Sequence, residues 1–228
     1  MKVITVKNYN EMSKKAAEIL IKEINKNPDL TAGFATGKTQ LGFYKRLVKS
    51  NNDFSKITSF NLDEFYPIKK TDKKSYYLYM FKNFFNKVNI KKSNINLLNG
   101  NARDYKKECK NYESKIKKNP IDIQFLGLGE NGHIAYNEPG SKLNSRTRLV
   151  NLTKSTIKRK KGPKNGLSMG IKTILSAKKI VLLASGKGKA KAVRCMVKGK
   201  IGEDCPASFL RKHKNVIVII DKKAGSLL

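Results

Sequence analysis

Short apolar runs recur along this chain, and each is followed by a segment with helical spacing. Ile121–Leu128, Ile180–Ala184 and Val216–Ile220 are nearly continuous apolar runs. Strands that are apolar on both faces are typical of a parallel sheet covered by helices on both sides. Between such runs, apolar residues stand three and four positions apart, as in Glu11–Asn25, which predicts helices. The alternation therefore predicts an α/β fold, a Rossmann-like open, mostly parallel sheet with helices on both faces.

The other predicted elements follow the same order of strand and then helix. Apolar spacing predicts strands at Val3–Val6, Ala32–Ala35 and Ile57–Leu62, and helices near residues 41–48, 75–88, 104–117 and 190–196. The 228 residues are enough for one α/β domain with a sizeable core. No linker rich in proline, serine and glycine divides them, so residues 1–228 are predicted to form a single domain.

The sequence indicates neither a membrane segment nor a disulfide framework. No apolar run approaches the roughly 18 residues needed to cross a bilayer. The start, MKVITV, has no signal-peptide core, which predicts a cytoplasmic protein without a membrane partner. Cys109, Cys195 and Cys205 form no CxxC pair, so disulfides and zinc are not expected. Cys109 falls on an apolar helical stripe, which predicts a buried thiol.

The net charge of the chain is unusually positive. It has 49 lysines and arginines against 17 acidic residues, for a formal charge of +32. Such a field attracts phosphate backbones without regard to sequence, so non-specific adhesion to nucleic acid is one interpretation. No nucleic-acid recognition motif accompanies the charge. We therefore favour a solvated lysine surface that also attracts a small anionic substrate, with no specific nucleic-acid partner.

Glycine and polar residues follow four of the predicted strands, at the point where each strand ends. They are residues 36–39 (TGKT), Asp63, residues 127–139 (GLGENGHIAYNEP) and residues 185–189 (SGKGK). In a parallel sheet the carboxyl ends of the strands share one edge, where ligands bind. We therefore expect these four segments to lie close together.

Within residues 127–139, His133 and Glu138 are candidates for acid–base chemistry. An imidazole titrates near neutral pH, and a carboxylate five residues away can orient and charge it. A buried histidine is also common as a purely structural residue, so the sequence pattern leaves both interpretations open.

The other strand ends also have a functional and a structural interpretation. Residues 36–39 and 185–189 precede predicted helices, whose N-terminal N–H groups bind phosphate, although ordinary turns have similar sequences. Asp63 directly follows a buried strand, so it is either a partly desolvated base or a turn residue. An acid–base pair, a second carboxylate and two phosphate sites together favour proton transfer on a small phosphorylated molecule.

Five blocks of the sequence resemble the signature blocks of the glucosamine-6-phosphate deaminase family. They are FNLDEFY (60–66), LGLGENGHIAYNEPGS (126–141), SRTRLVNLT (145–153), MGIKTILSAKKIVLLASGKGKAKAV (169–193) and PASFLRKH (206–213). The resemblance covers nearly the whole chain. The sister family of 6-phosphogluconolactonases shares the fold, but the first two blocks are similar to those of the deaminases.

The resemblance implies conversion of glucosamine 6-phosphate and water to fructose 6-phosphate and ammonia, with no cofactor and no metal. His133 would assist opening of the sugar ring with the support of Asn131 and Glu138. Asp63 would move a proton between C2 and C1. The candidate catalytic residues are thus Asp63, Asn131, His133 and Glu138, and those for substrate phosphate are Thr36, Gly37, Lys38, Thr39 and Lys189.

The chain departs from the family pattern in the phosphate loop and in the lid, and Asn131 stands where many members have aspartate. Lys38 and Gln40 replace the usual glycine and proline, and a positive φ at Lys38 would cost about 1 kcal/mol. The lid, about residues 151–168, is shorter than in the family, and its phosphate-binding arginine has no clear counterpart. The candidates to replace that arginine are Arg159, Lys160 and Lys161.

Residues 148–150 (RLV) lack the lysine that binds the effector phosphate in allosteric hexameric members. The resemblance therefore implies a short, non-allosteric member that is a monomer or a small homo-oligomer. The alternatives are a 6-phosphogluconolactonase-like enzyme, another sugar-phosphate isomerase on the same fold, or a weakened sugar-phosphate-binding protein.

Overall fold

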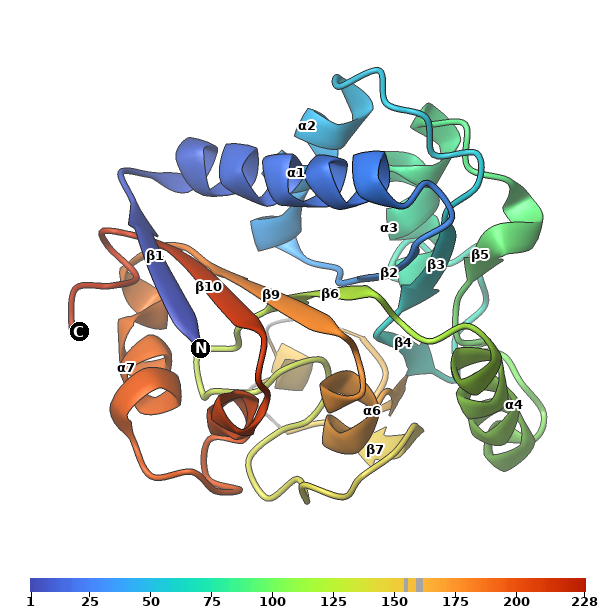
Figure 1. The fold of residues 1–228 in the computed structure, drawn as a ribbon. Coiled ribbons are helices and arrows are strands. Elements are labelled where there is room, and N and C mark those ends of the chain that lie inside the picture. Colours follow the sequence, from blue (N-terminus) through green and yellow to red (C-terminus); the bar gives the residue numbers. More distant parts are fainter. Residues whose placement is uncertain (154–155, 159–161) are drawn as a thin grey trace.

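A seven-stranded parallel sheet forms the centre of the computed structural model, which describes residues 1–153, 156–158 and 162–228 (Figure 1). The strand order is β1-β10-β9-β6-β2-β3-β5. The bounds are β1 Lys2–Val6, β2 Thr31–Phe34, β3 Thr58–Asn61, β5 Ile95–Asn96, β6 Ile123–Gly127, β9 Lys179–Ala184 and β10 Val216–Asp221. Every pair of neighbouring strands in this sheet is parallel.

The strand order places a topological switch point at the centre of the sheet. From β2 the chain adds β3 and then β5 on one side, and it later adds β6, β9 and β10 on the other. The connections that leave β2 and β6 therefore diverge, which opens a crevice at the carboxyl ends of these two strands. Open α/β sheets bind their ligands in such a crevice.

Helices cover both faces of the sheet. One face packs against α1 (Tyr9–Lys26), α2 (Leu41–Val48) and α3 (Tyr76–Asn83), as the upper layer of Figure 1 shows. The opposite face carries α4 (Tyr105–Lys118), α6 (Ile171–Leu175) and α7 (Ala190–Lys198). Each layer has its own buried hydrophobic cluster, since alternate residues of every strand point to opposite faces.

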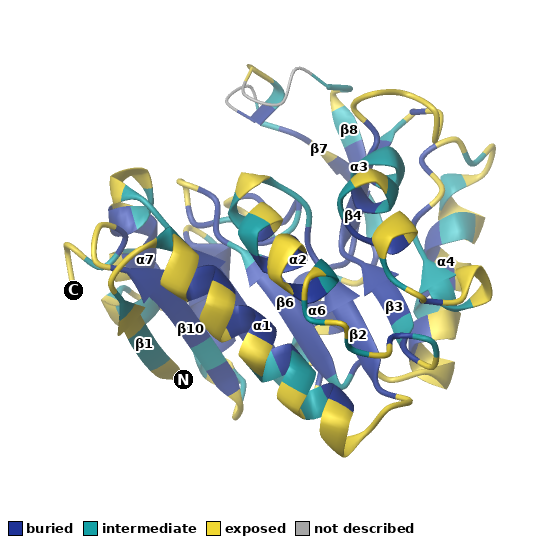
Figure 2. Cartoon of the chain, turned by 90° about the horizontal axis from the view of Figure 1, so that it is seen from above, coloured by how far each residue is buried: buried dark blue, intermediate teal, exposed yellow. Residues whose placement is uncertain are grey.

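Helix α1 shows how local sequence sets an element. The Asn8 side chain accepts a hydrogen bond from the Glu11 backbone N–H and so caps the first turn. Met12, Ala16 and Leu20 are fully buried along one stripe, and Figure 2 shows exposed residues on the outer side of this helix. The apolar stripe packs on the sheet, and the lysines of α1 remain in solvent.

A second, smaller sheet lies beside the central one and was not predicted from the sequence. Its antiparallel strands are β4 (Asp63–Tyr66), β8 (Asn165–Ser168) and β7 (Arg148–Asn151), in that order. β3 ends at Asn61 and β4 begins at Asp63, so one apolar run supplies strands to both sheets. β4 pairs with β8 across about 100 positions of sequence, so no local pattern indicates this second sheet.

The predicted fold class is confirmed, and the differences are one shortened helix and several elements that were not predicted. The helix expected over 75–88 is shorter, because Phe84 leaves helical geometry and a 3-10 turn follows at Phe85–Lys87. The sequence prediction also missed β5, α6 and the 3-10 helix Pro206–Lys212. Cys109 is buried on α4, as expected. Among the described residues, no helix combines the length and apolar character needed to cross a bilayer.

Candidate active site

A cavity of about 480 Å³ lies at the switch point, at the carboxyl ends of the central strands. All four strand-end segments predicted from the sequence contribute to it, together with two tyrosines. Its lining includes Ala35, Thr36, Gly37, Lys38, Thr39, Leu62, Asp63, Tyr76, Gly127, Leu128, Gly129, Glu130, His133, Ala135, Tyr136, Ser185 and Lys189. The expectation that these segments meet at one edge is therefore confirmed.

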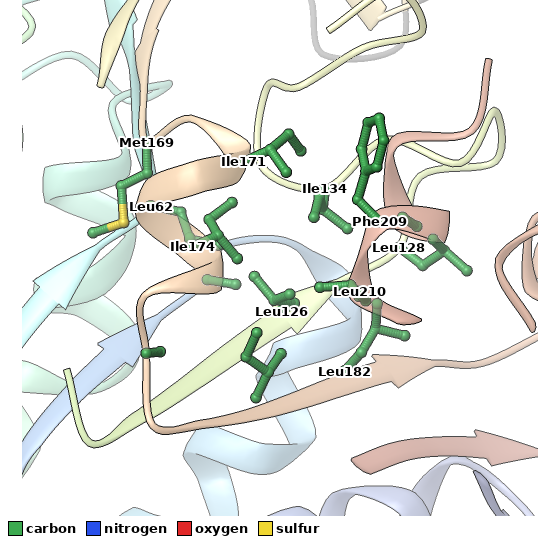
Figure 3. Close-up of a cluster of buried hydrophobic side chains, with 14 of the residues drawn as sticks. Leu62, Leu126, Leu128, Ile134, Met169, Ile171, Ile174, Leu182, Phe209 and Leu210 are labelled. Atoms are coloured by element: carbon green, nitrogen blue, oxygen red, sulfur yellow. The ribbon is translucent and has the colours of Figure 1, made fainter. Parts of the chain in front are cut away.

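The segment after β6 is fixed to the core by its apolar residues. Leu128 and Ile134 are buried in the hydrophobic cluster beneath the cavity, where Figure 3 shows them beside Leu210 and Phe209. The Gly129 N–H donates to the His133 carbonyl oxygen at 2.8 Å, which closes the turn. These anchors hold the backbone rigidly, so the polar side chains between them are presented to the cavity in fixed positions.

Gly129 is required by the position of the His133 ring. A Cβ added at Gly129 would lie 2.4 Å from the imidazole carbon and nitrogen atoms, far inside van der Waals contact. Gly132 has φ +83°, a conformation that favours glycine. The glycines of this segment therefore serve the placement of the imidazole, in contrast to a dinucleotide-binding loop.

His133, Asn131 and Glu138 form one hydrogen-bonded network. His133 Nδ1 lies 2.6 Å from Asn131 Oδ1 and 3.2 Å from Glu138 Oε2. Asn131 Nδ2 also donates to Glu138 Oε2 at 2.6 Å. Because these contacts use Nδ1, Nε2 is the ring nitrogen that can exchange a proton with a ligand.

The Glu138 carboxyl is buried and ionised. Burial alone would raise its pKa, but hydrogen bonding to His133, the His133 charge and donors on Thr156 and Asn131 outweigh this effect and lower the pKa to about 2. Thr156 Oγ1 donates to Glu138 Oε1 at 2.5 Å. Thr156 belongs to the segment predicted to be the lid, and no sequence motif marks it as a site residue. Its contact links that segment directly to the network.

Asp63 is the first residue of β4 and also lines the cavity. This residue is 8% exposed. Two buried tyrosines flank this part of the cavity, and Tyr136 Oη donates to Tyr76 Oη at 2.8 Å. Burial raises the pKa of Tyr76, and the negative charge of Asp63 adds to the rise. Both tyrosines thus remain neutral hydrogen-bonding groups.

Tyr76 and Tyr136 were missed as site residues in the sequence. Tyr76 belongs to an aromatic run whose spacing is typical of residues in a hydrophobic core. Tyr136 lies between the two candidate residues His133 and Glu138. The only available signal was the position of Tyr136 inside residues 127–139. Their contact joins α3 to that segment across 60 positions of sequence, which only the tertiary structure reveals.

Two turns with nearly the same backbone conformation border the cavity at the expected phosphate sites. Gly37 has φ 109° and ψ 167°, and Gly186 has φ 93° and ψ 153°. Each glycine precedes a short 3-10 helix, at Lys38–Gln40 and Lys187–Lys189, that continues into an α-helix. The left-handed conformation falls on Gly37, so Lys38 escapes the strain that a positive φ would have imposed.

Cations and N–H groups converge on these turns. The Lys189 side chain is 17% exposed, and its Nζ lies 3.9 Å from Glu130 Oε1 across the cavity mouth. Lys38 is exposed at the rim. Turns that open helices, with cations beside them, suit an anion such as a phosphate ester.

The candidates to replace the phosphate-binding arginine of the lid were Arg159, Lys160 and Lys161. All three lie outside the described residues. Thr156 and Gly162 are described, and a Cβ at Gly162 would meet the Phe65 ring at 2.5 Å. Within the described ranges, no group of three or more His, Cys, Asp or Glu side chains is arranged to hold a metal ion.

Comparison with known proteins agrees with this geometry. Residues 7–219 match the family model for glucosamine-6-phosphate isomerases/6-phosphogluconolactonase. A glucosamine-6-phosphate deaminase of Clostridium novyi (strain NT) is 48% identical, over 100% of both chains. The enzyme of the same name from Thermoanaerobacter sp. (strain X514) is 46% identical, over 100% of this chain and 95% of that protein.

Solved structures show the same relationship. A monomeric glucosamine-6-phosphate deaminase is 43% identical, with a TM-score of 0.97 over 100% of both chains. A 6-phosphogluconolactonase from Leishmania guyanensis shares the fold at 21% identity and a TM-score of 0.81, over 98% of this chain and 97% of the other. The chain therefore belongs to the glucosamine-6-phosphate isomerase/6-phosphogluconolactonase family, on the side of the glucosamine-6-phosphate deaminases.

Proposed function

We propose that this chain is a glucosamine-6-phosphate deaminase, which converts glucosamine 6-phosphate and water to fructose 6-phosphate and ammonia. The observation that carries the proposal is the cavity itself. It combines a histidine held by a carboxylate, a second carboxylate and two phosphate-type turns. Full-length relatives with 46% to 48% identity carry that enzyme name, which supports the same reaction here.

His133 is assigned the opening of the sugar ring. Ring opening moves a proton from the C1 hydroxyl and returns one to the ring oxygen, which suits an imidazole near neutral pH. The Glu138 carboxylate stabilises the imidazolium that forms, because it is ionised and lies 3.2 Å from Nδ1. Asn131 bridges the two groups and restrains the plane of the ring.

Asp63 is assigned the proton transfer between carbons C2 and C1. A carboxylate removes the C2 proton of the open-chain amino aldehyde and delivers a proton to C1, while O1 takes a proton from the C2 ammonium group, which leaves a protonated imine at C2. Water then adds to that imine, and ammonia departs to leave the ketone of fructose 6-phosphate. Low exposure of Asp63 favours this role, because a partly desolvated carboxylate is a better base.

Substrate phosphate is assigned to the two turns. Thr36, Gly37, Lys38 and Thr39 of one turn and Lys189 of the other would donate to the phosphate, in a cavity whose volume of about 480 Å³ suits a small ligand. Residues 151–168 would act as the lid, and the hydrogen bond from Thr156 would connect the lid to the Glu138 carboxylate. We further propose a single domain and a monomer in the cytoplasm, the oligomeric state by analogy with the monomeric deaminase of similar structure.

The first prediction tests the assigned base. Asp63→Asn should lower kcat at least about a hundredfold, since the amide cannot accept the C2 proton and general-base loss costs about two to four orders of magnitude. The measurement is ammonia release coupled to a dehydrogenase, with fructose 6-phosphate quantified in parallel. Binding of glucosamine 6-phosphate should persist in the variant.

The surface variant Asp72→Asn is the control and should keep wild-type turnover. Wild-type protein that releases no ammonia at saturating substrate would reject the deaminase assignment. If that protein instead hydrolysed a phosphogluconolactone, the lactonase alternative would take its place. Binding of the sugar phosphate without either reaction would identify a sugar-phosphate-binding protein.

A further inference from the structure

The carboxylate of Asp221 supports one of the two phosphate turns from beneath. Asp221 is the last residue of β10 and is 5% exposed. Its Oδ2 accepts a hydrogen bond from Ser185 Oγ at 2.5 Å, and both oxygens lie 3.1 Å from the Gly186 N–H. Oδ1 also accepts from the Ala224 N–H at 2.7 Å. Three donors from two segments therefore converge on one buried side chain.

These contacts fix the turn that presents Lys189. Ser185 and Gly186 connect β9 to the 3-10 helix Lys187–Lys189, and Gly186 has φ 93°. Restraint of the Ser185 hydroxyl and the Gly186 N–H sets the direction in which this helix leaves the sheet. Both Ser185 and Lys189 line the cavity, so a rotation of the turn would move the cation away from the phosphate position.

The hydrogen bond to Asp221 also prevents the Ser185 hydroxyl from donating to a ligand in the cavity. A hydroxyl has one proton, and here the proton is directed to Asp221. Ser185 therefore offers the cavity lone pairs and not a donor, so phosphate on this side must be held by Lys189 and backbone N–H groups. Ser185 thus fixes the turn to Asp221 through this hydrogen bond.

The two phosphate turns differ in what supports them, although their backbones match. At the first turn, the Gly37 carbonyl oxygen accepts from Tyr79 Oη at 2.8 Å, a neutral donor on α3. At the second turn, an ionised carboxylate accepts three donors. Burial would raise the pKa of Asp221, but the bonds from Ser185, Ala224 and Gly186 outweigh it and hold the pKa below its usual range.

We propose that Asp221 is a positioning residue for phosphate binding, which acts through Ser185 and Gly186 and never touches the substrate. The ligand class is a phosphate monoester, and its identity as an amino-sugar phosphate rests on the proposed function. A carboxylate is needed because both of its oxygens accept. An asparagine in its place would offer one acceptor oxygen and would direct an NH₂ group toward the donors.

The chain provides a matched control at the opposite edge of the sheet. Asp122 accepts a hydrogen bond from the Thr31 backbone N–H at 2.8 Å and another from Lys178 Nζ at 2.8 Å. It stands just before β6, at the amino end of the strand, and does not line the cavity. Asp122→Asn therefore removes a comparable carboxylate that accepts a backbone hydrogen bond without disturbing either phosphate turn.

The experiment compares Asp221→Asn and Asp122→Asn with the wild type by calorimetric titration with inorganic phosphate and with glucosamine 6-phosphate. Asp221→Asn should raise both dissociation constants, and the KM for the sugar phosphate, at least about tenfold, as expected for loss of hydrogen bonds to a charged group. Its kcat at saturating substrate should change by no more than about threefold, because the acid–base groups are untouched. Asp122→Asn should leave every binding constant unchanged.

A second variant keeps the test informative if Asp221→Asn does not fold. Gly186→Ala meets no atom within 4 Å, so it strains only the φ of the turn and should weaken phosphate binding in the same way. Unchanged phosphate affinity in Asp221→Asn or in Gly186→Ala would overturn the proposal, as would equal weakening in Asp122→Asn. Wild-type protein that binds no phosphate at all would overturn it too.

These outcomes are distinguishable from failure of the proposed function. Wild-type protein that binds phosphate through Asp221 but releases no ammonia would reject the deaminase assignment and retain the positioning role. Ammonia release by Asp221→Asn with wild-type KM would reject the positioning role alone.

Discussion

At the scale of single residues, the site depends on a glycine, Gly129, that leaves space for the His133 ring. The His133 ring occupies the space where a Gly129 side chain would be, and its Nδ1 is held by Asn131 and Glu138. Removal of the Asn131 or Glu138 side chain would delete a contact to the ring. Addition of one methyl group at Gly129 would instead displace the ring, which makes position 129 a sensitive test of how closely the ring must be placed.

Gly129→Ala is therefore predicted to lower kcat/KM roughly a hundredfold, the cost of misplacing a reacting group by about 1 Å. The new Cβ would lie 2.4 Å from the imidazole, so the ring must move out of the network. Steady-state ammonia release measures the effect, with thermal unfolding recorded in parallel. Gly202→Ala is the matched control, since no atom lies within 4 Å of its Cβ. Wild-type activity in Gly129→Ala would show that the ring position is not critical.

At the scale of elements, the position of α3 depends on a buried carboxylate that follows Asp63 directly. Glu64 is 2% exposed and accepts hydrogen bonds from the backbone N–H groups of Phe65, Tyr76 and Tyr77, each at 2.8 Å. Two of these donors open α3, where a carboxylate also interacts favourably with the helix dipole. Glu64 thus joins β4 to the helix that places Tyr76 in the cavity wall.

Glu64 is predicted to make the stability of the fold depend on pH near neutrality. Burial raises the pKa of Glu64 from 4.5 to about 7, although the three N–H donors oppose the rise. A group with a raised pKa in the folded state stabilises it fully below the unfolded pKa, and this contribution disappears as pH rises through about 7. As pH rises from about 5 to about 8, Glu64 ionises, and the unfolding free energy of the wild type should therefore fall by about 2 to 3 kcal/mol.

Chemical denaturation of wild type and Glu64→Gln at both pH values measures this effect. The glutamine variant cannot titrate at that position, so its stability relative to the wild type should improve by that amount as pH rises. Glu138, with a pKa lowered to about 2, is ionised throughout this window and does not contribute. The surface variant Glu18→Gln is the control. A constant difference between Glu64→Gln and wild type at the two pH values would contradict the prediction.

At the scale of the whole molecule, the charge of +32 surrounds a cavity that is suited to an anion. With 17 acidic residues for 49 basic ones, most lysines and arginines have no acidic residue to pair with. Ion pairs such as that of Lys142 with Glu203 are also largely exposed, so the positive field remains. A field of this size raises the local concentration of anionic substrate and the rate of encounter. Salt screens such a field over about 10 Å at 0.1 M.

The kcat/KM for glucosamine 6-phosphate is therefore predicted to fall about tenfold as KCl rises from about 20 mM to about 500 mM, while kcat changes little. Initial rates at substrate concentrations far below KM measure it, and sucrose in place of salt controls for viscosity. Binding of duplex DNA should disappear over the same range, because it depends on the same charge. A kcat/KM that is independent of salt would show that the lysine surface does not steer the substrate.

Much of the fold was predictable because its signals are local. Residues 121–128 are mostly apolar, with Ile123, Phe125 and Leu126 at the centre, and such a run is typical of a strand that is covered on both faces. The candidate site followed from the same strands, since the carboxyl ends of parallel strands share one edge. His133, Glu138, Asp63 and Lys189 were all found to line or adjoin one cavity for this reason.

The second sheet and the supports of the site were not predictable in this way. β4, β8 and β7 are short, and β4 pairs with β8 across about 100 positions of sequence, as in the pairing of Asp63 with Ser168. The role of Asp221 has no sequence signal, because two of its three donors, Ser185 and Gly186, lie more than 30 positions away. A side chain that accepts hydrogen bonds from another part of the chain has no periodic signature.

The sequence alone therefore determined the class of fold, the edge of the sheet that carries the site and the residue types available there. These depend on hydrophobic periodicity and on turn chemistry, which act over a few residues. Tertiary structure alone decided which nitrogen of His133 faces the cavity, that Tyr76 and Tyr136 form its wall, and that Asp221 supports a phosphate turn. Each of these depends on a contact between distant segments, and folding brings such segments together only when the apolar faces of the strands and helices are buried.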